Sequence, residues 1–327
     1  MNTSTIFGIT NWCLTIFAGL LYLSIFIIVI KCHRELHNLS VILTCNTCLA
    51  AFLTCITVFI MVSSNLFNGY LLHDIHFCYV WGLFYDIFEC SIYYSYCLQA
   101  FFRLCRVVFY KKRFLVSYSL YNVLIIVQWI LVFSLLVPTL FLQWYIRLPT
   151  ETYCLIPYTD TYASTYLIIV LYLIPLIFIT TIYIWITLYV RQSSHPTATG
   201  LTINRRQRNL RDLTVIKRII ILISILMILR FPTIIFIIYG VIAGHLFAYT
   251  YAIVGLITLL CMIFIALITI HITPELRNNI LNLMTSRDNR VDSRVVTLHQ
   301  LSNQVAIHRN TTPTVQKSDS RNLPHAP

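Results

Sequence analysis

The sequence predicts an all-α membrane protein, built as a bundle of seven transmembrane helices. Of its 327 residues, 58% are hydrophobic and only 10% are charged, against roughly 25% charge in a soluble domain. Seven segments are apolar over at least the ~20 residues that a helix needs to cross the hydrocarbon core of a bilayer. These runs are continuously apolar, whereas the strands of a membrane barrel alternate between apolar and polar residues. The chain therefore fits a helical bundle and not a barrel.

The first expected helix, 9–31, follows a short outer N-terminus of residues 1–8. No Lys or Arg precedes Lys31, and the apolar stretch is too long for the core of a signal peptide, so we expect it to stay in the protein as an uncleaved helix. The remaining six helices are expected at 39–63, 78–109, 119–143, 162–190, 214–240 and 246–272. Together these segments make a membrane domain of residues 9–272.

A short amphipathic eighth helix is expected at 273–285. Thr273 is suited to cap its N-terminus, and Pro274 to occupy its first turn. Its apolar face consists of Leu276, Ile280, Leu281 and Met284. Such a helix lies along the inner membrane surface. Residues 286–327 are polar without an apolar period, which predicts a disordered cytoplasmic tail.

The distribution of basic residues predicts the orientation of the bundle. Of the 23 Lys and Arg residues, 21 lie beside or within the connections after the first, third and fifth segments, at the start of the sixth, or in the C-terminal region. Only Arg147 falls in the other connections, and only Arg230 falls near the middle of a segment. Because basic residues stay on the cytoplasmic side, we expect the N-terminus outside and the C-terminus inside. Attraction of the basic residues to anionic lipid of the inner leaflet accounts for the net charge of +12. We therefore expect no nucleic-acid partner.

Other functional classes fit the sequence less well. We find no metal-binding spacing of Cys or His, no nucleophile motif and no phosphate-binding loop, and we expect neither enzymatic activity, nor a metal, nor a cofactor. A retinal photoreceptor needs a lysine in its seventh helix, and 246–272 contains none. The alternative that stays open is a multi-pass transporter or channel with a buried Glu/Arg site, although only 8 glycines offer little for the broken helices of transporters.

Over roughly residues 9–284 the chain resembles the rhodopsin-like (class A) G-protein-coupled receptors. The resemblance rests on marks at the family's spacing across four helices and one outer loop, none of them specific by itself: Cys78, Arg103, Trp129, Cys154, Pro175, Tyr183, Asp212 and Pro232. It implies a disulfide between Cys78 and Cys154, which joins the third helix to the second outer loop. It also implies a plasma-membrane receptor that passes the binding of an extracellular ligand to a heterotrimeric G protein.

The resemblance further implies a switch at the inner end of the bundle. Arg103 would pair with Asp212 and hold the third and sixth helices together, or turn to the hydroxyl of Tyr183. Pro232 would kink the sixth helix. Arg103, Arg106, Lys217 and Arg218 would contribute to the G-protein interface, although the basic cluster 205–218 is also suited to anchor the helix to anionic lipid. Phosphorylated Ser and Thr of the tail would serve an arrestin.

The chain also departs from the family pattern. Phe102 replaces the acidic residue before the arginine, and the aspartate of the second helix is replaced at Cys48 or Ala51. The run 265–269 reads Ile-Ala-Leu-Ile-Thr where an Asn-Pro-x-x-Tyr motif is expected. We therefore expect the family's polar sodium pocket to be missing.

Three charges that lie inside the membrane, away from the ends of their segments, require partners, because an ionised group near the bilayer centre costs ~3 kcal/mol even on the gentlest scale. They are Asp86, Glu89 and Arg230. The resemblance places Glu89 opposite Arg230 at the base of the ligand pocket, so we expect an ion pair there; a purely structural pair is the alternative. The expected ligand pocket comprises Tyr85, Asp86, Glu89, Tyr93, Arg230 and Tyr251. A peptide or a small polar molecule would suit the acidic residues Asp86, Glu89, Glu151 and Asp160, with a preference for peptide.

Overall fold

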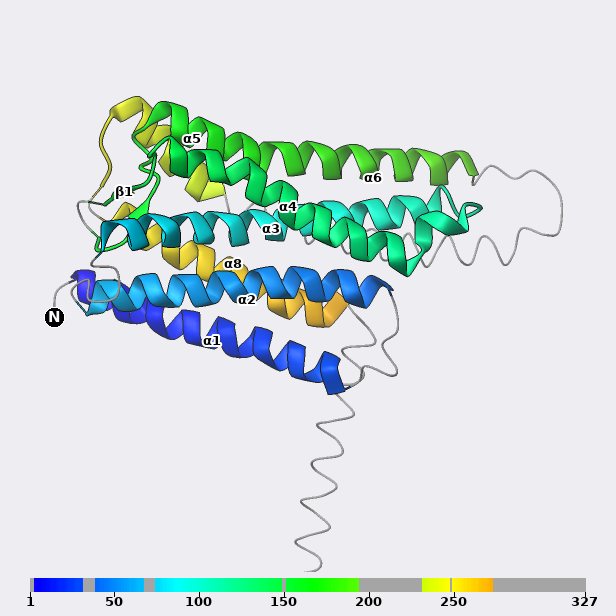
Figure 1. Ribbon diagram of the computed structural model, residues 1–327, viewed down its shortest axis with the longest axis horizontal. Coiled ribbons are helices and arrows are strands. Elements are labelled where there is room, and N and C mark those ends of the chain that lie inside the picture. The colour runs from blue at the N-terminus through cyan, green and yellow to red at the C-terminus, as the bar shows by residue number, and fades with distance from the viewer. Residues whose placement is uncertain are drawn as a thin grey trace, which may run out of the picture. The chain divides into compact units, whose positions relative to one another are not determined.

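A computed structural model describes residues 3–31, 39–67, 74–148, 151–193, 231–247 and 249–272. In it, α1 (Thr3–Lys31), α2 (Leu39–Leu66), α3 (Ile75–Val107), α4 (Tyr118–Phe141), α6 (Ile174–Ser193) and α8 (Thr250–Ile272) run lengthwise, as Figure 1 shows. The closest packing joins α1 to α2 and α8, and α3 to α2, α4 and α6. The short helix α5 (Thr161–Leu167) and a π-helical turn, η3 (Ile168–Leu173), continue directly into α6.

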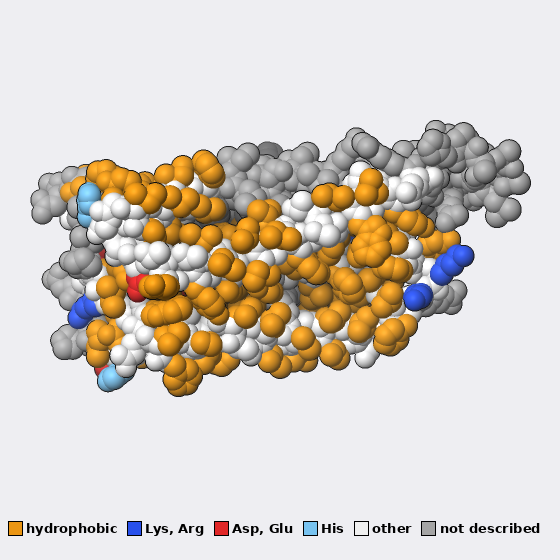
Figure 2. All heavy atoms as spheres, turned by 90° about the horizontal axis from the view of Figure 1, so that it is seen from above, with side chains coloured by type: hydrophobic (Ala, Val, Ile, Leu, Met, Phe, Trp, Pro, Cys, Tyr) orange, Lys and Arg blue, Asp and Glu red, His pale blue; other side chains and the backbone are white. Residues whose placement is uncertain are grey.

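Five apolar helical segments of the described chain are long enough to cross a membrane: Thr5–Val29, Leu39–Leu66, Tyr118–Phe141, Thr161–Val190 and Thr250–Ile270. The helix Phe231–Ala243 is apolar but shorter over its described part. With 33 residues, α3 is about 50 Å long, and it carries two acidic residues in its first half. The face seen in Figure 2 is hydrophobic over most of its length, with charged side chains near its ends. These features are those of a helical membrane protein.

Local sequence signals set several helix boundaries. Asp74 caps α3 by accepting a hydrogen bond from the His76 N–H at 3.0 Å, and Ser117 caps α4 in the same way. Asp160 caps α5 through the N–H groups of Tyr162 and Ala163. Because Pro175 has no N–H, it cannot donate to the turn before it, and the widened π turn lies directly N-terminal to this proline.

The centre of the bundle contains a network of buried polar side chains. Asn46 of α2 donates to Gln128 of α4 at 2.7 Å and accepts from Trp129 at 2.9 Å. Gln128 in turn donates to the Ser91 carbonyl of α3. A second group links Thr47 to Ser95 at 2.7 Å and to Gln99 at 2.8 Å. In an apolar interior such groups are costly without partners, so these bonds fix how α2, α3 and α4 meet.

The expected and observed helices differ by a few residues at their ends. The third begins at Ile75 instead of 78 because Asp74 provides its cap, and the seventh begins at Thr250 instead of 246. A small antiparallel hairpin of β1 (Ile146–Arg147) and β2 (Cys154–Leu155) was not expected. The predicted eighth helix (273–285), the tail (286–327) and the part of 214–240 before Phe231 lie outside the described residues.

Candidate functional site

A disulfide bond between Cys78 and Cys154 joins the first turn of α3 to β2, as the resemblance implies. The hairpin pairs Ile146 with Leu155 and Arg147 with Cys154. We call the segment 144–160 the hairpin loop, and the end of the bundle on which it lies, predicted to be extracellular, the outer end (Figure 1). The hairpin loop is thus fixed to the helices below it.

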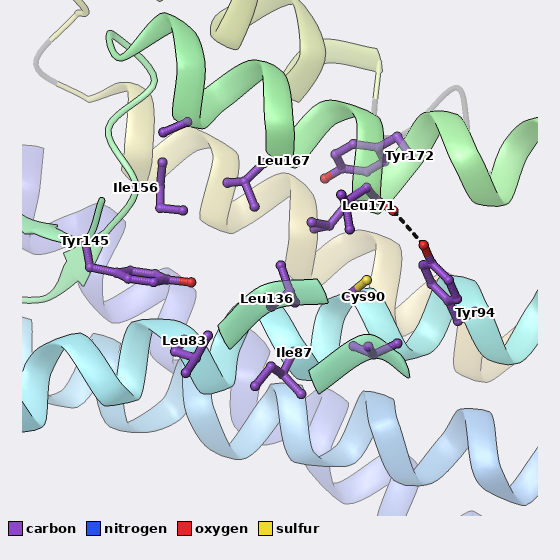
Figure 3. Packing of buried hydrophobic residues seen from close by; sticks show 13 residues of the cluster. Leu83, Ile87, Cys90, Tyr94, Leu136, Tyr145, Ile156, Leu167, Leu171 and Tyr172 are labelled. Atoms are coloured by element: carbon purple, nitrogen blue, oxygen red, sulfur yellow. Dashed lines mark hydrogen bonds between the residues drawn. The ribbon is translucent and has the colours of Figure 1, made fainter. Parts of the chain in front are cut away.

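Gly82 of α3 lets the hairpin loop approach closely. A Cβ atom at this position would lie 2.6 Å from the Cys154 carbonyl oxygen and 2.9 Å from the Tyr145 ring. Neither neighbour is free to retreat, since Cys154 is held by its disulfide and Tyr145 is only 1% exposed. Tyr145 packs in one apolar cluster with Leu83 and Ile156, drawn in Figure 3. Glycine is therefore required here for space.

A second attachment joins the hairpin loop to the outer end of α2. The Asn65 amide donates to the Glu151 carboxylate, and the Asn65 carbonyl oxygen accepts from the N–H of Thr152 at 3.2 Å and from its hydroxyl at 3.3 Å. Burial raises the pKa of Glu151 above its ordinary value, and the bond from Asn65 partly offsets that rise. The loop is thus fastened both to α2 and to α3.

Beneath this loop lies a cavity of about 50 Å³ between α1, α2, α3 and α8. Most of its wall is apolar, as at Met61 and Val254, and two of the predicted pocket residues, Tyr85 and Tyr251, line it. Tyr251 accepts a hydrogen bond from the Tyr158 N–H at 3.2 Å, and the two rings lie 5.0 Å apart. The cavity is therefore closed on one side by an aromatic contact between α8 and the hairpin loop.

The two acidic pocket candidates lie elsewhere, since neither Asp86 nor Glu89 lines this cavity. Asp86, 5% exposed, accepts a hydrogen bond from the Tyr145 hydroxyl at 2.8 Å, and Thr139 donates to that same hydroxyl. Glu89, 3% exposed, accepts from the hydroxyl of Tyr172 at 3.4 Å. Both carboxylates thus face the side of α3 that packs against α4, η3 and the hairpin loop.

The remaining pocket candidates are divided between the described and undescribed residues. The ring of Tyr93 packs edge to face against Tyr172 at 5.3 Å, and near it the hydroxyl of Tyr94 donates to the Val170 carbonyl, as Figure 3 shows. Arg230, the expected partner of Glu89, lies outside the described residues. The expected pocket is thereby separated into the cavity with Tyr85 and Tyr251 and a buried acidic group with Tyr93.

At the opposite end of α3, Arg103 is half-buried and faces α6. Its guanidinium lies within electrostatic range of the buried Tyr183 phenol. Arg106, one turn further on, is exposed. Pro232 is half-buried in the helix Phe231–Ala243, whereas Asp212, Lys217 and Arg218 lie outside the described residues. The structure thus brings together two of the four predicted switch residues.

Sequence reasoning missed several residues that shape the outer end. Asn65 and Tyr145 hold the hairpin loop, Tyr158 meets Tyr251, and Asn11 of α1 lines the cavity. The one available signal was Asn11, the only residue with a side-chain amide in the mainly apolar first helix. For the others, no local pattern indicates which distant partner they meet.

These observations define a class of protein: a helical membrane protein in which a disulfide joins a loop to one of the long helices. The family model described as 7 transmembrane receptor (rhodopsin family) matches residues 24–271. The chain therefore belongs to the rhodopsin family of seven-transmembrane receptors. A comparison with curated proteins finds no match.

Proposed function

We propose that this receptor transmits the binding of an extracellular ligand to a heterotrimeric G protein across the plasma membrane. Its family membership supports a signalling role over that of a transporter or channel. The proposal is supported by what lies at the two ends of α3. A covered cavity lies at the outer end, and Arg103 faces Tyr183 at the inner end. One rigid helix thus connects a binding site with a polar contact suited to switching.

The proposed switch has two arrangements of the same bundle. In one, Arg103 pairs with Asp212 and draws the sixth helix toward α3. In the other, Arg103 turns to Tyr183 of α6, and the sixth helix, kinked at Pro232, moves away and opens a groove. A ligand that binds one arrangement more tightly shifts the population toward it. A groove between helices of this kind receives a helix of the partner protein.

We place the G-protein contact at the inner end, on Arg103, Arg106, Lys217 and Arg218, with anionic lipid around the basic cluster 205–218. In this proposal the chain crosses the membrane seven times, with residues 1–8 outside, an amphipathic helix at 273–285, and a cytoplasmic tail at 286–327 that serves an arrestin when phosphorylated. The Glu89–Arg230 ion pair belongs to the same proposal. It would tie α3 to the sixth helix below the cavity.

The experiment is recruitment of a panel of G proteins to the full-length receptor in cells exposed to pooled peptides and metabolites. Charged hydrogen bonds contribute about 1.5–3 kcal/mol, so Arg103→Ala is expected to reduce recruitment at least about tenfold. Lys111→Ala is the matched control, because it removes an exposed positive charge outside the proposed interface. Arg103→Ala receptors that reach the surface normally and recruit like the parent would contradict the proposal.

A further inference from the structure

The cavity beneath the hairpin loop contains a hydrogen-bond acceptor without a donor. Asn11 lines the cavity and is only 6% exposed. Its amide nitrogen donates to the Ala252 carbonyl of α8 at 3.2 Å, but its Oδ1 atom accepts no hydrogen bond from any described residue. An acceptor left unpaired in an apolar interior costs free energy. The cavity therefore offers this acceptor to a donor that the described residues do not supply.

The described residues of the cavity wall are aromatic, aliphatic or neutral polar, and none carries a charge. Four tyrosines line it: Tyr85, Tyr153, Tyr158 and Tyr251. The face of an aromatic ring is negative and attracts cations. Of the described residues that line the cavity, none is Lys, Arg or His. Burial, together with the charge of Glu151, raises the pKa of the Tyr153 phenol. Among the described lining residues an anion would meet no positive side chain, whereas a cation would meet the Asn11 Oδ1 acceptor and aromatic rings.

The dimensions limit what can enter. A cavity holds one water once roughly 10–15 Å³ of it is open to a probe of that size, so about 50 Å³ accommodates a group of a few heavy atoms. A water needs two to four polar partners to be held well, but much of this wall is aliphatic, with Val58, Met61 and Leu259 among its residues. A group that joins a charged donor to a short alkyl part fits both the acceptor and the aliphatic wall.

We propose that this cavity binds a protonated primary amine, with the ammonium donating to Asn11 Oδ1 and its alkyl portion against the aliphatic wall. The inference rests on the proposed function, since it names the chemistry of the extracellular ligand. A free small amine and the N-terminus of a peptide share this chemistry. Asn11 is then a specificity-determining residue that sequence reasoning did not single out.

The test measures thermal unfolding of the full-length receptor in lipid nanodiscs with ethylammonium chloride, with sodium propionate, an anion that carries the same ethyl group, or with potassium chloride. We expect a saturable rise in Tm with ethylammonium alone. Triglycine amide and its N-acetylated form separate the two sources. A rise in Tm with the free peptide but not with the acetylated one assigns the site to a peptide N-terminus. A rise with ethylammonium but with neither peptide assigns it to small amines. No rise with either amine would overturn the proposal.

Two variants locate the binding. Asn11→Leu keeps the size of the side chain but removes the acceptor, and it should weaken the apparent affinity for ethylammonium at least about tenfold. Asn122→Leu, at an exposed position of α4, is the matched control and should bind like the parent. Undiminished binding by Asn11→Leu would place the amine elsewhere and remove the inference.

Gly255→Ala keeps the test decisive if Asn11→Leu does not fold. The added Cβ would lie 3.5 Å from the Asn11 amide nitrogen, an ordinary contact, and would occupy part of the cavity. Alanine also favours the helix over glycine, so the variant should fold and yet lose the ethylammonium response.

Binding of the amine does not require a G protein, so the two proposals fail separately. A receptor that binds amines without recruitment would refute only the signalling proposal, and one that signals to another ligand but ignores amines would refute only this inference.

Discussion

At the scale of single residues, the approach of the hairpin loop to α3 depends on the missing side chain of Gly82. We expect Gly82→Ala to lower the free energy of unfolding by about 1–3 kcal/mol, because overpacking against a fixed carbonyl and ring forces the backbone to shift. Thermal unfolding of the purified receptor measures the change. Gly19→Ala is the control, since a Cβ atom there meets nothing within 4 Å. Equal Tm values for the two variants would show that the loop adapts.

Glu151 gives the outer end a dependence on pH. Because its pKa is raised in the folded protein, the protonated carboxyl favours folding. That stabilisation is complete below the ordinary pKa and is lost as the pH rises through the raised pKa. Glu151→Gln keeps an acceptor for Asn65 but does not titrate. We expect the variant to match the parent in Tm near pH 4 and to exceed it near pH 7. Parallel pH profiles would contradict the assignment.

At the scale of helices, the bonds of Asn46 and Gln128 couple α2 to α4. A double-mutant cycle of Asn46→Leu and Gln128→Leu should give a coupling energy of about 0.5–2 kcal/mol, the range seen for hydrogen bonds between membrane helices. The measurement is the unfolding free energy of the parent, both single variants and the double variant. Asn46→Leu combined with Asn122→Leu should be additive, because Asn122 is exposed on α4, the helix that carries Gln128. Additivity in both pairs would remove the network as a link between helices.

The helices themselves were largely predictable, because a continuous apolar run of sufficient length fixes where a helix lies. The hairpin was not, since strands of two residues have no period and exist through the disulfide and the contacts of Tyr145. The same limit applies to the site. The disulfide and the nearness of Arg103 to Tyr183 were implied by the resemblance to the receptor family, but a period of 3.6 residues cannot tell which neighbour a face meets. Asp86 thus turned out to lie against Tyr145 and not in the cavity.

At the scale of the whole molecule, the basic residues predict the orientation of the chain. Epitope tags at the two termini test it: we expect the N-terminal tag to be labelled on intact cells and the C-terminal tag only after permeabilisation. The same experiment on the Cys78→Ala variant controls for folding, because loss of the disulfide should lower the amount at the surface without inverting the chain. Both termini labelled on intact cells would exclude an odd number of crossings.

The π turn ahead of Pro175 has a consequence for the direction in which α6 presents its side chains. A π turn holds one residue more than the α-helical turn it replaces, and one residue corresponds to ~100° of rotation. Deleting Ile169, which is 40% exposed within this turn, would leave an ordinary helix and keep Tyr183 directed at Arg103. The same deletion below Pro175 would turn the neighbouring Ile184, now 56% exposed, toward Arg103 instead. The wide turn therefore absorbs one residue, so a deletion within it leaves unchanged the face that α6 presents to α3.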